Sequence, residues 1–298
     1  MLNYSTNQQN IIEKIAVNIV NIERINRGSI LLQKTSELRP EDSDLFLDMA
    51  QAALKTMENE NKSKLLNHPQ AFTVSFAGKQ ARFILADANE HIHNQLLHSK
   101  RFYEEDLLTA IHQLAMPNAV LVDIGANIGN HAIFFASIIG GKVYAYEAQP
   151  TNFARLQANI AVNELQELIE AHQVAITAKS GVCEVIAPHA ENMGQCFVEQ
   201  NINGTCQMRP LDDYDFATIS FLKIDVEGAE LEVIAGAAKT IEAHHPYIFI
   251  EAQTVKAFTA ICAALKLYGY APTRRFCFTP TYMFEPMPSY AAFHFENY

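Results

Sequence analysis

Long apolar runs are missing from this sequence, and glycine and proline are scarce. The 298 residues contain 12 glycines and 11 prolines, too few for a collagen-like or low-complexity protein. The longest strongly apolar stretch, residues 132–139, is far shorter than the roughly 20 residues that a helix needs to span a bilayer. The first ten residues show no basic cluster followed by an apolar run, so they do not resemble a secretory signal. We expect a globular, cytoplasmic protein without a membrane span.

Basic residues and cysteine motifs are also in short supply. The 22 lysines and arginines are outnumbered by 33 aspartates and glutamates, which gives a net charge of −11. An acidic surface repels phosphate backbones, so we expect no nucleic-acid partner. The five cysteines form no C-x-x-C pattern, and their number is odd, which argues against a disulfide framework or a zinc cluster.

Residues 1–68 and 69–298 differ in their apolar patterns. In the first region, isoleucines recur every three or four residues from Ile12 to Ile25, which predicts a helical N-terminal extension with one apolar face. We expect this face to pack on the rest of the chain or to form a homodimer, and a lid over a substrate site is the alternative. The second region begins with alternating residues that predict a β-hairpin over 72–86.

Short apolar strands alternate with helices from residue 119 onward. This order predicts an α/β fold, in which helices cover both faces of a parallel sheet. Ligands of such sheets bind beyond the carboxyl ends of the strands, so functional residues are sought there. Strands are expected at 120–122, 143–146, 170–176, 221–224 and 247–250. Helices are expected at about 104–115 and 129–137, and three more are expected, of which one begins at 150 and the other two end at 238 and 266.

The first of these strands runs into a segment with two glycines four residues apart, Gly125 and Gly129. A dinucleotide fingerprint has three glycines, and a P-loop has lysine after its last glycine, so neither motif is present. Glycines still allow a ligand to lie against the backbone. Asp123 suits an ammonium group better than a phosphate, which favours a ligand with a cationic amino-acid end. A purely structural turn is the alternative.

Three later strand ends carry acidic residues. Glu147 ends the second strand, where a carboxylate can accept hydrogen bonds from ribose hydroxyls, and helix capping is the alternative. Lys223 and Asp225 share one side of the fourth strand, because side chains alternate along a strand. Residues 223–230 contain four ionisable groups beside a buried strand, which indicates a ligand site or, alternatively, an ion-pair network. The fifth strand ends in Glu251.

The sequence resembles the FkbM-type S-adenosylmethionine-dependent methyltransferases between about residues 102 and 284. The most specific part is the segment from Lys223 to Glu230. The resemblance also rests on residues 122–129, on Glu147 with the helix that follows it, on residues 211–213 and 279–282, and on the pair Tyr103-Glu104. In this sequence Ala148 and Gln149 separate Glu147 from Pro150, where proline often follows the acid directly.

This resemblance implies a class I methyltransferase fold, a Rossmann-like sheet of seven mostly parallel strands with a reversed last strand. It also implies S-adenosyl-L-methionine as the cofactor. Carried over to this sequence, Glu147 would hold the ribose, and the backbone from Ala175 to Thr177 would lie beside the adenine. The residues implied around the methionine part are Asp123, Gly125, Asn127 and Gly129, and Glu104 would also contribute to cofactor binding.

The resemblance implies methyl transfer to a hydroxyl oxygen, which needs alignment and a base. Asp225 is the first candidate base, and Glu251 and His131 are the next. Alternatively, Asp225 and Glu251 hold a divalent ion that acidifies the hydroxyl. No dedicated metal site is predicted, and the pair His91 and His93 is interpreted as surface.

The acceptor is expected to be a small molecule or glycan, namely a saccharide, a glycoconjugate or a related compound. Ten aromatic residues fall within 268–298, where some can pack against a sugar ring while Arg274 and Arg275 meet an anionic group. A nicotinamide-dependent oxidoreductase and a catalytically silent nucleoside-binding protein are the alternatives on the same sheet.

Overall fold

A computed structural model describes residues 71–84, 91–186, 197–201 and 204–287 of the chain. The helical extension predicted over residues 1–68 lies outside this range, and so do the aromatic residues beyond 287. No helix in the described part is long and apolar enough to cross a membrane.

The described chain begins with a β-hairpin and two helices, which the sequence predicts in part. The hairpin joins β1 (Ala71–Phe76) to β2 (Lys79–Ile84) through a turn at residues 77 and 78, within the range expected for it. Helix α4 (His91–Ser99) follows and contains His91 and His93. Helix α5 (Glu105–Leu114) matches the prediction.

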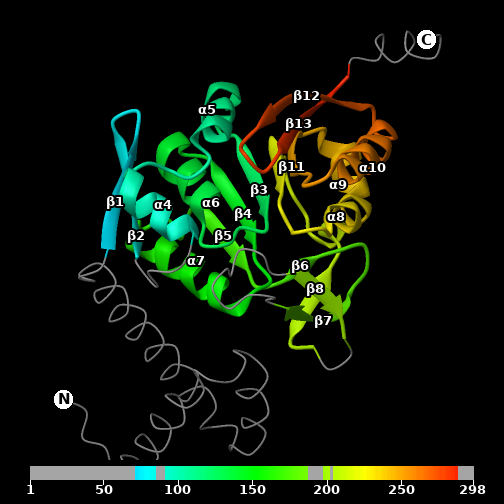
Figure 1. Cartoon of the computed structure of the whole chain (residues 1–298), viewed down its shortest axis with the longest axis horizontal. Helices are drawn as coiled ribbons and strands as arrows, with labels where there is room; N and C mark the ends of the chain where they lie inside the picture. The colour runs from blue at the N-terminus through cyan, green and yellow to red at the C-terminus, as the bar shows by residue number, and fades with distance from the viewer. Residues whose placement is uncertain (1–70, 85–90, 187–196, 202–203, 288–298) are drawn as a thin grey trace, which may run out of the picture. The chain divides into compact units, whose positions relative to one another are not determined.

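A seven-stranded sheet forms the centre of the described structure (Figure 1). Its strand order is β12-β13-β11-β10-β3-β4-β5, and β13 alone runs against its neighbours β11 and β12. This arrangement confirms the expected seven-stranded, mostly parallel sheet with a reversed last strand. The strands are β3 (Val120–Ile124), β4 (Lys142–Tyr146), β5 (Ile169–His172), β10 (Phe221–Ile224), β11 (Tyr247–Glu251), β12 (Tyr270–Phe276) and β13 (Thr281–Pro286).

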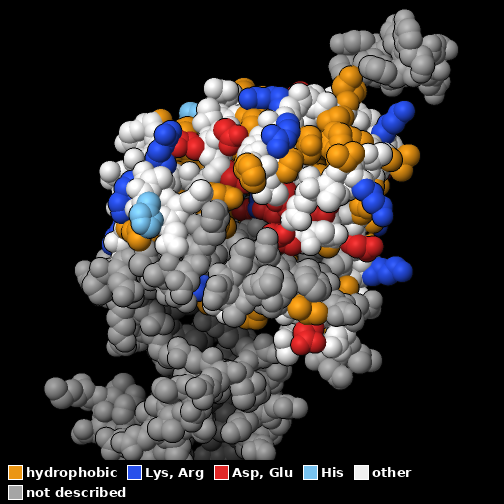
Figure 2. Space-filling model, viewed as in Figure 1, with side chains coloured by type: hydrophobic (Ala, Val, Ile, Leu, Met, Phe, Trp, Pro, Cys, Tyr) orange, Lys and Arg blue, Asp and Glu red, His pale blue; other side chains and the backbone are white. Residues whose placement is uncertain are grey.

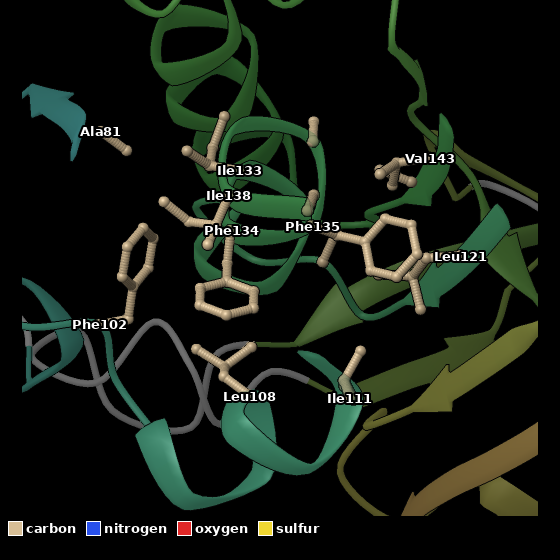
Figure 3. Close-up of a cluster of buried hydrophobic side chains, with 14 of the residues drawn as sticks. Ala81, Phe102, Leu108, Ile111, Leu121, Ile133, Phe134, Phe135, Ile138 and Val143 are labelled. Atoms are coloured by element: carbon tan, nitrogen blue, oxygen red, sulfur yellow. The ribbon is translucent and has the colours of Figure 1, made fainter. Parts of the chain in front are cut away.

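Helices cover both faces of the sheet and bury an apolar cluster on each. On one face, Phe134 and Phe135 pack among side chains of the hairpin, of α5 and of β3, and Figure 3 shows the Phe134 ring pointing toward Leu108 and the Phe135 ring toward Leu121. The other cluster includes the isoleucines of β10 and β11. The first face carries α5, α6 (Asn130–Phe134) and α7 (Pro150–Val162), and the second carries α8 (Glu230–Gly236), α9 (Ala238–His244) and α10 (Val255–Lys266).

Three elements differ from the prediction. The third strand, expected over 170–176, is split into β5 and β6 (Ala175–Ile176), because β6 pairs with β9 in a second sheet. That four-stranded sheet also contains β7 (Gly181–Ile186), β8 (Phe197–Gln200) and β9 (Cys206–Arg209). The helix expected to end near 137 continues as a π-helical turn, Phe135–Ile139, and the helix expected through 238 is divided into α8 and α9.

Candidate active site at the carboxyl ends of the central strands

A buried lysine organises the centre of the site. Parallel pairing of β3 and β10 places Lys223 beside Asp123, and strand alternation puts Asp225 on the same face. The Lys223 Nζ lies 3.4 Å from Asp123 Oδ1 and 3.2 Å from Asp225 Oδ2, and it donates to the Gly125 carbonyl at 3.0 Å. Burial lowers the pKa of Lys223, but the two carboxylates outweigh it, so the pKa is raised overall. The lysine therefore stays charged and ties the two aspartates together.

The loop after β3 depends on backbone conformations that glycine favours. Gly125 has φ +77°, and a Cβ placed there would lie 1.8 Å from the carbonyl oxygen of Asp225. Gly129 has φ +91° and precedes α6, where a Cβ would meet the Leu156 side chain at 2.6 Å. Asn127 also has a positive φ, of 51°, which costs energy for a residue with a side chain. This strained loop is held by its packing against β10 and α7.

Glu147 joins the ends of β3 and β4. Its Oε2 accepts from the Asn127 backbone N–H at 2.7 Å, and its Oε1 accepts from the Gln149 backbone N–H at 2.8 Å. Burial raises the pKa of Glu147 to about 7 despite these two hydrogen bonds. Gln149, whose side chain accepts from Asn152 N, caps α7. The capping alternative for Glu147 is therefore wrong, and each carboxylate oxygen retains a lone pair for a further donor.

Three carboxylates gather where β10 and β11 end. One oxygen from each of Asp225, Glu227 and Glu251 lies within 4.8 Å of the others. Burial and the charge of Asp225 raise the pKa of Glu227 to about 7, and the same causes together with Glu227 raise that of Glu251 to about 8. Gln253 Nε2 donates to both glutamates, at 2.6 Å and 3.1 Å. Figure 2 shows acidic side chains in a recess near the middle of the described surface.

Glu104 and His131 meet above the same face of the sheet. The segment before α5 is held by Asn130, whose side chain accepts from Tyr103 N at 3.0 Å and donates to Tyr103 O at 2.9 Å. This places Glu104 Oε2 at 3.3 Å from His131 Nε2, with both side chains almost buried. Burial raises the pKa of Glu104, but His131 and Lys223 outweigh that effect and lower it overall.

Ala175 lies on the other side of Glu147. It is buried in β6 and belongs to a small apolar cluster with Ala148, which follows Glu147 directly. The structure therefore brings Ala175 close to Glu147, whereas Asp225 pairs with Lys223 and has Glu251 beside it, and His131 contacts Glu104. The other residues predicted for the site lie at the carboxyl ends of the central strands, in the loops that follow them, in the segment before α5 and in α6.

Two side chains near the loop after β3 hold buried acceptor oxygens without a hydrogen-bond partner. Asp123 is fully buried, and neither of its carboxylate oxygens has a hydrogen-bond partner, although Lys223 neutralises part of its charge. The Asn127 Oδ1 is also buried without a partner. Buried acceptors are normally satisfied, so these atoms indicate a ligand with several N–H donors. The ammonium group of an amino acid has three such donors and a positive charge, and the amino-acid end of S-adenosylmethionine therefore fits.

The sequence interpretation missed part of the site. It placed Lys223 on the correct side of β10 but did not recognise that the lysine bonds to the loop after β3. Glu227 was given no role in the site, although one of its oxygens lies within 4.8 Å of those of Asp225 and Glu251. The hydrogen bond from the Cys277 backbone N–H to Asp106 Oδ2, at 3.0 Å, was not predicted because 171 residues separate the two in the sequence.

The comparison with protein families agrees with this geometry. Residues 123–272 match the family described as the methyltransferase FkbM domain, which is half of the chain. The chain belongs to the FkbM methyltransferase family. Its seven-stranded sheet has the class I methyltransferase arrangement, so the resemblance seen in the sequence is confirmed.

One curated relative is the hexuronic acid methyltransferase AglP of Haloferax volcanii. It is 25% identical over 144 residues, which cover 47% of this chain and 58% of that protein. The chain thus matches less than two thirds of the length of this relative.

Two solved structures are also similar. The methyltransferase FkbM of Methylobacillus flagellatus is 18% identical, with a TM-score of 0.43 and coverage of 78% of this chain and 60% of that one. The precorrin-6y C5,15-methyltransferase of Geobacter metallireducens is 16% identical, with a TM-score of 0.39 and coverage of 62% and 87%.

Proposed function

We propose that this chain transfers a methyl group from S-adenosylmethionine to a hydroxyl oxygen of a saccharide, a glycoconjugate or a related small molecule. The observation that carries the proposal is the set of buried acceptor oxygens on Asp123 and Asn127, which lack hydrogen-bond partners at the carboxyl end of β3. Membership of the FkbM family supports the same activity. The similarity to a hexuronic acid methyltransferase supports a saccharide as the acceptor class.

The cofactor would lie along the loops after β3 and β4. Asp123 and Asn127 would accept from its ammonium group, while Gly125 and Gly129 let the loop between them pack closely against Asp225 and Leu156. Glu147 would accept from the ribose hydroxyls with its remaining lone pairs, and the backbone at Ala175 would border the adenine. When bound, the cofactor supplies an electrophilic methyl group on a sulfonium ion, for which an acidic site is favourable.

Asp225 is the best-placed base among the candidates. It lies 3.2 Å from the positive Lys223 Nζ, which fixes its position at the strand end. Glu251 has a pKa raised to about 8 by burial and by Asp225, so near neutral pH it holds a proton and is a poorer acceptor of another. His131 faces Glu104 and is better placed to orient that residue. Asp225 would take the hydroxyl proton as the oxygen attacks the methyl carbon.

A divalent ion is the second mechanism to test. Asp225 and Glu251 are joined by Glu227, which adds a third carboxylate to the pair considered from the sequence. Hard cations such as Mg²⁺ bind carboxylate oxygens, and a bound ion would acidify the acceptor hydroxyl. Chelation should abolish turnover, and added Mg²⁺ should restore it, if this mechanism operates. Full activity after exhaustive chelation would leave Asp225 as the base.

Calorimetry with the full chain tests the cofactor directly. S-adenosylmethionine and S-adenosylhomocysteine should bind and raise the melting temperature, because a ligand of the native state stabilises it by mass action. NAD should do neither. Tight NAD binding without adenosylmethionine binding would favour the oxidoreductase alternative, and cofactor binding without any product would favour a silent binding protein.

A further inference from the structure

A cavity of about 630 Å³ lies between the start of α5 and the turn that joins β12 to β13. Tyr103, Glu104 and Asp106 line it from the helix side, and Arg275 and Phe278 line it from the turn side. The volume falls within the range of roughly 300–1,000 Å³ that is typical of small-molecule sites. It is large enough for a sugar ring.

The turn that forms one wall is fixed in place. Cys277 N donates to Asp106 Oδ2 at 3.0 Å, and Cys277 Sγ lies 3.6 Å from Asp106 Oδ1. On its other side, Ala252 N donates to the Pro280 carbonyl at 2.9 Å, which ties the turn to the end of β11. These contacts hold the two walls together without a ligand, so the cavity is preformed.

The cavity borders the strand-end acids. Glu104 is part of its lining and also contacts His131, the second residue of α6. Tyr103 also lines the cavity and lies near the strand-end acids. Burial raises the pKa of its hydroxyl, and the charges of Glu104, Asp225, Cys277 and Glu251 raise it further. A molecule in the cavity would therefore have one end beside the strand ends, where the methyl group is proposed to lie.

The lining combines an aromatic platform with a guanidinium and two carboxylates. Phe278 is the most exposed large hydrophobic side chain in the described part of the chain, at 101%. An aromatic face on a fixed turn can pack against the apolar face of a sugar ring. Arg275 makes no ion pair with any described residue and donates only to the Phe278 carbonyl, at 3.3 Å. Glu104 and Asp106 offer acceptors for sugar hydroxyls.

We propose that this cavity is the acceptor subsite and that it takes a single sugar ring that carries a carboxylate, as a uronic acid does. The ring packs on Phe278, the carboxylate pairs with Arg275, and the hydroxyl that receives the methyl group points past Glu104 toward Asp225. Arginine matches a carboxylate with two parallel donors, which gives the pair both strength and orientation. This proposal rests on the methyltransferase function proposed above.

The test compares two sugars that differ only in the charged group. Methyl β-D-glucuronide and methyl β-D-glucoside are titrated into the full chain in the presence of saturating S-adenosylhomocysteine, and binding is followed by saturation-transfer NMR. The variants are Phe278→Ala, Arg275→Gln and the control Arg274→Gln. Arg274 is the adjacent exposed arginine, which stacks on Phe276 and does not line the cavity. All three side chains are exposed apart from this stacking, so the fold should be retained.

The wild type should bind the glucuronide more tightly than the glucoside. Arg275→Gln should weaken glucuronide binding by roughly tenfold or more, the scale of a lost hydrogen bond between charged groups, and leave the glucoside unaffected. Phe278→Ala should weaken the binding of both sugars, and Arg274→Gln should weaken the binding of neither. An unchanged ratio of the two affinities in Arg275→Gln, or no sugar binding by the wild type, would overturn the proposal. S-adenosylhomocysteine binding in the same samples reports separately on the proposed function.

Discussion

The loops after β3 and β4 are shaped by the backbone, whereas the cavity beside α5 is shaped by side chains from distant parts of the chain. In the first region, which we call the cofactor loops (residues 123–129 and 147–149), glycine conformations and backbone hydrogen bonds to Glu147 fix the geometry. In the second, the acceptor cavity, an exposed turn is fixed by the contacts of Asp106 with Cys277.

This difference matches the two proposed roles, since the cofactor is always the same molecule whereas the acceptor can vary. Under the proposed function, the cofactor loops present the same groups to the same molecule, and their geometry depends on local backbone constraints that few substitutions preserve. The acceptor cavity relies on exposed side chains, such as Phe278 and Arg275, that can change without disturbing the core. Substitutions should therefore reduce stability and cofactor affinity in the first region, and acceptor affinity alone in the second.

The largest effect is expected at Gly125. A methyl group there meets the Asp225 carbonyl and also requires a positive φ, so Gly125→Ala should lower the free energy of unfolding by about 3 kcal/mol or more. Gly78 in the hairpin turn is the matched control, because its φ is +79° and nothing lies within 4 Å of its added Cβ. Gly78→Ala should cost only about 1 kcal/mol. Equal losses in chemical denaturation would show that the close contact with Asp225 is unimportant.

The next effect is expected at Asp225, between the two regions. Asp225→Asn keeps the shape of the side chain but removes its charge, so turnover per folded molecule should drop by about 10²-fold. Affinity for S-adenosylmethionine should change little. If Asp225 served only to pair with Lys223, the variant would instead lose stability while its folded fraction turned over normally.

A substitution at Glu147 tests whether the cofactor loops bind the ribose, with cofactor affinity as the measurement. Glu147→Gln replaces one acceptor oxygen by a donor that faces a backbone N–H, and it removes the charge that favours hydrogen bonds from the ribose. Cofactor binding should weaken by about 1.5–3 kcal/mol in calorimetry. Glu167→Gln, at an exposed position, is the control. Retention of full affinity in Glu147→Gln would remove the ribose role.

Glu147 also predicts a pH dependence of stability. Its pKa is raised from 4.5 to about 7, so between these values the folded protein holds a proton that the unfolded chain has released. Stability contributed by this group therefore falls as the pH rises from about 4.5 to about 7. The stability of Glu147→Gln, measured by denaturation across this range, should decline less steeply than that of the wild type. Parallel curves would contradict the raised pKa.

The smallest effect is expected at Phe278. Its side chain is fully exposed, so Phe278→Ala should change the free energy of unfolding by less than about 0.5 kcal/mol. Phe276, two residues earlier, is 5% exposed, and Phe276→Ala should cost about 3 kcal/mol or more. A large loss of stability in Phe278→Ala would place this residue in the fold rather than in the acceptor cavity.

Local patterns explain how much of this structure could be predicted. The strands at 120–124 and 221–224 follow from short apolar runs, and alternation along β10 correctly placed Lys223 and Asp225 on one side. The number of strands and the reversed last strand came from the resemblance, and the order in which the strands pair was not predicted, since periodicity does not specify it. The split between β5 and β6 depends on pairing with β9, more than 30 residues later, which no local signal encodes.

The acceptor cavity was harder to predict for the same reason. The aromatic and arginine content of the C-terminal segment suggested an acceptor site, but nothing local indicated that Cys277 would bond to Asp106. The contact between Glu104 and His131 likewise depends on how Asn130 holds Tyr103. The helical extension over residues 1–68, its role in a homodimer and the cytoplasmic location stay predictions.

The most direct test of the central claim is the position of a transferred methyl group. The full chain would be incubated with S-adenosylmethionine that carries a deuterated methyl group and with a panel of neutral and uronic-acid glycosides, and the products would be analysed by mass spectrometry. We predict one labelled methyl ether on a sugar hydroxyl for each S-adenosylhomocysteine formed, with uronic acids preferred. Label in an alkali-labile methyl ester, or on nitrogen or carbon, would contradict the proposed hydroxyl chemistry, and no label in any product would contradict the proposed saccharide methyl transfer.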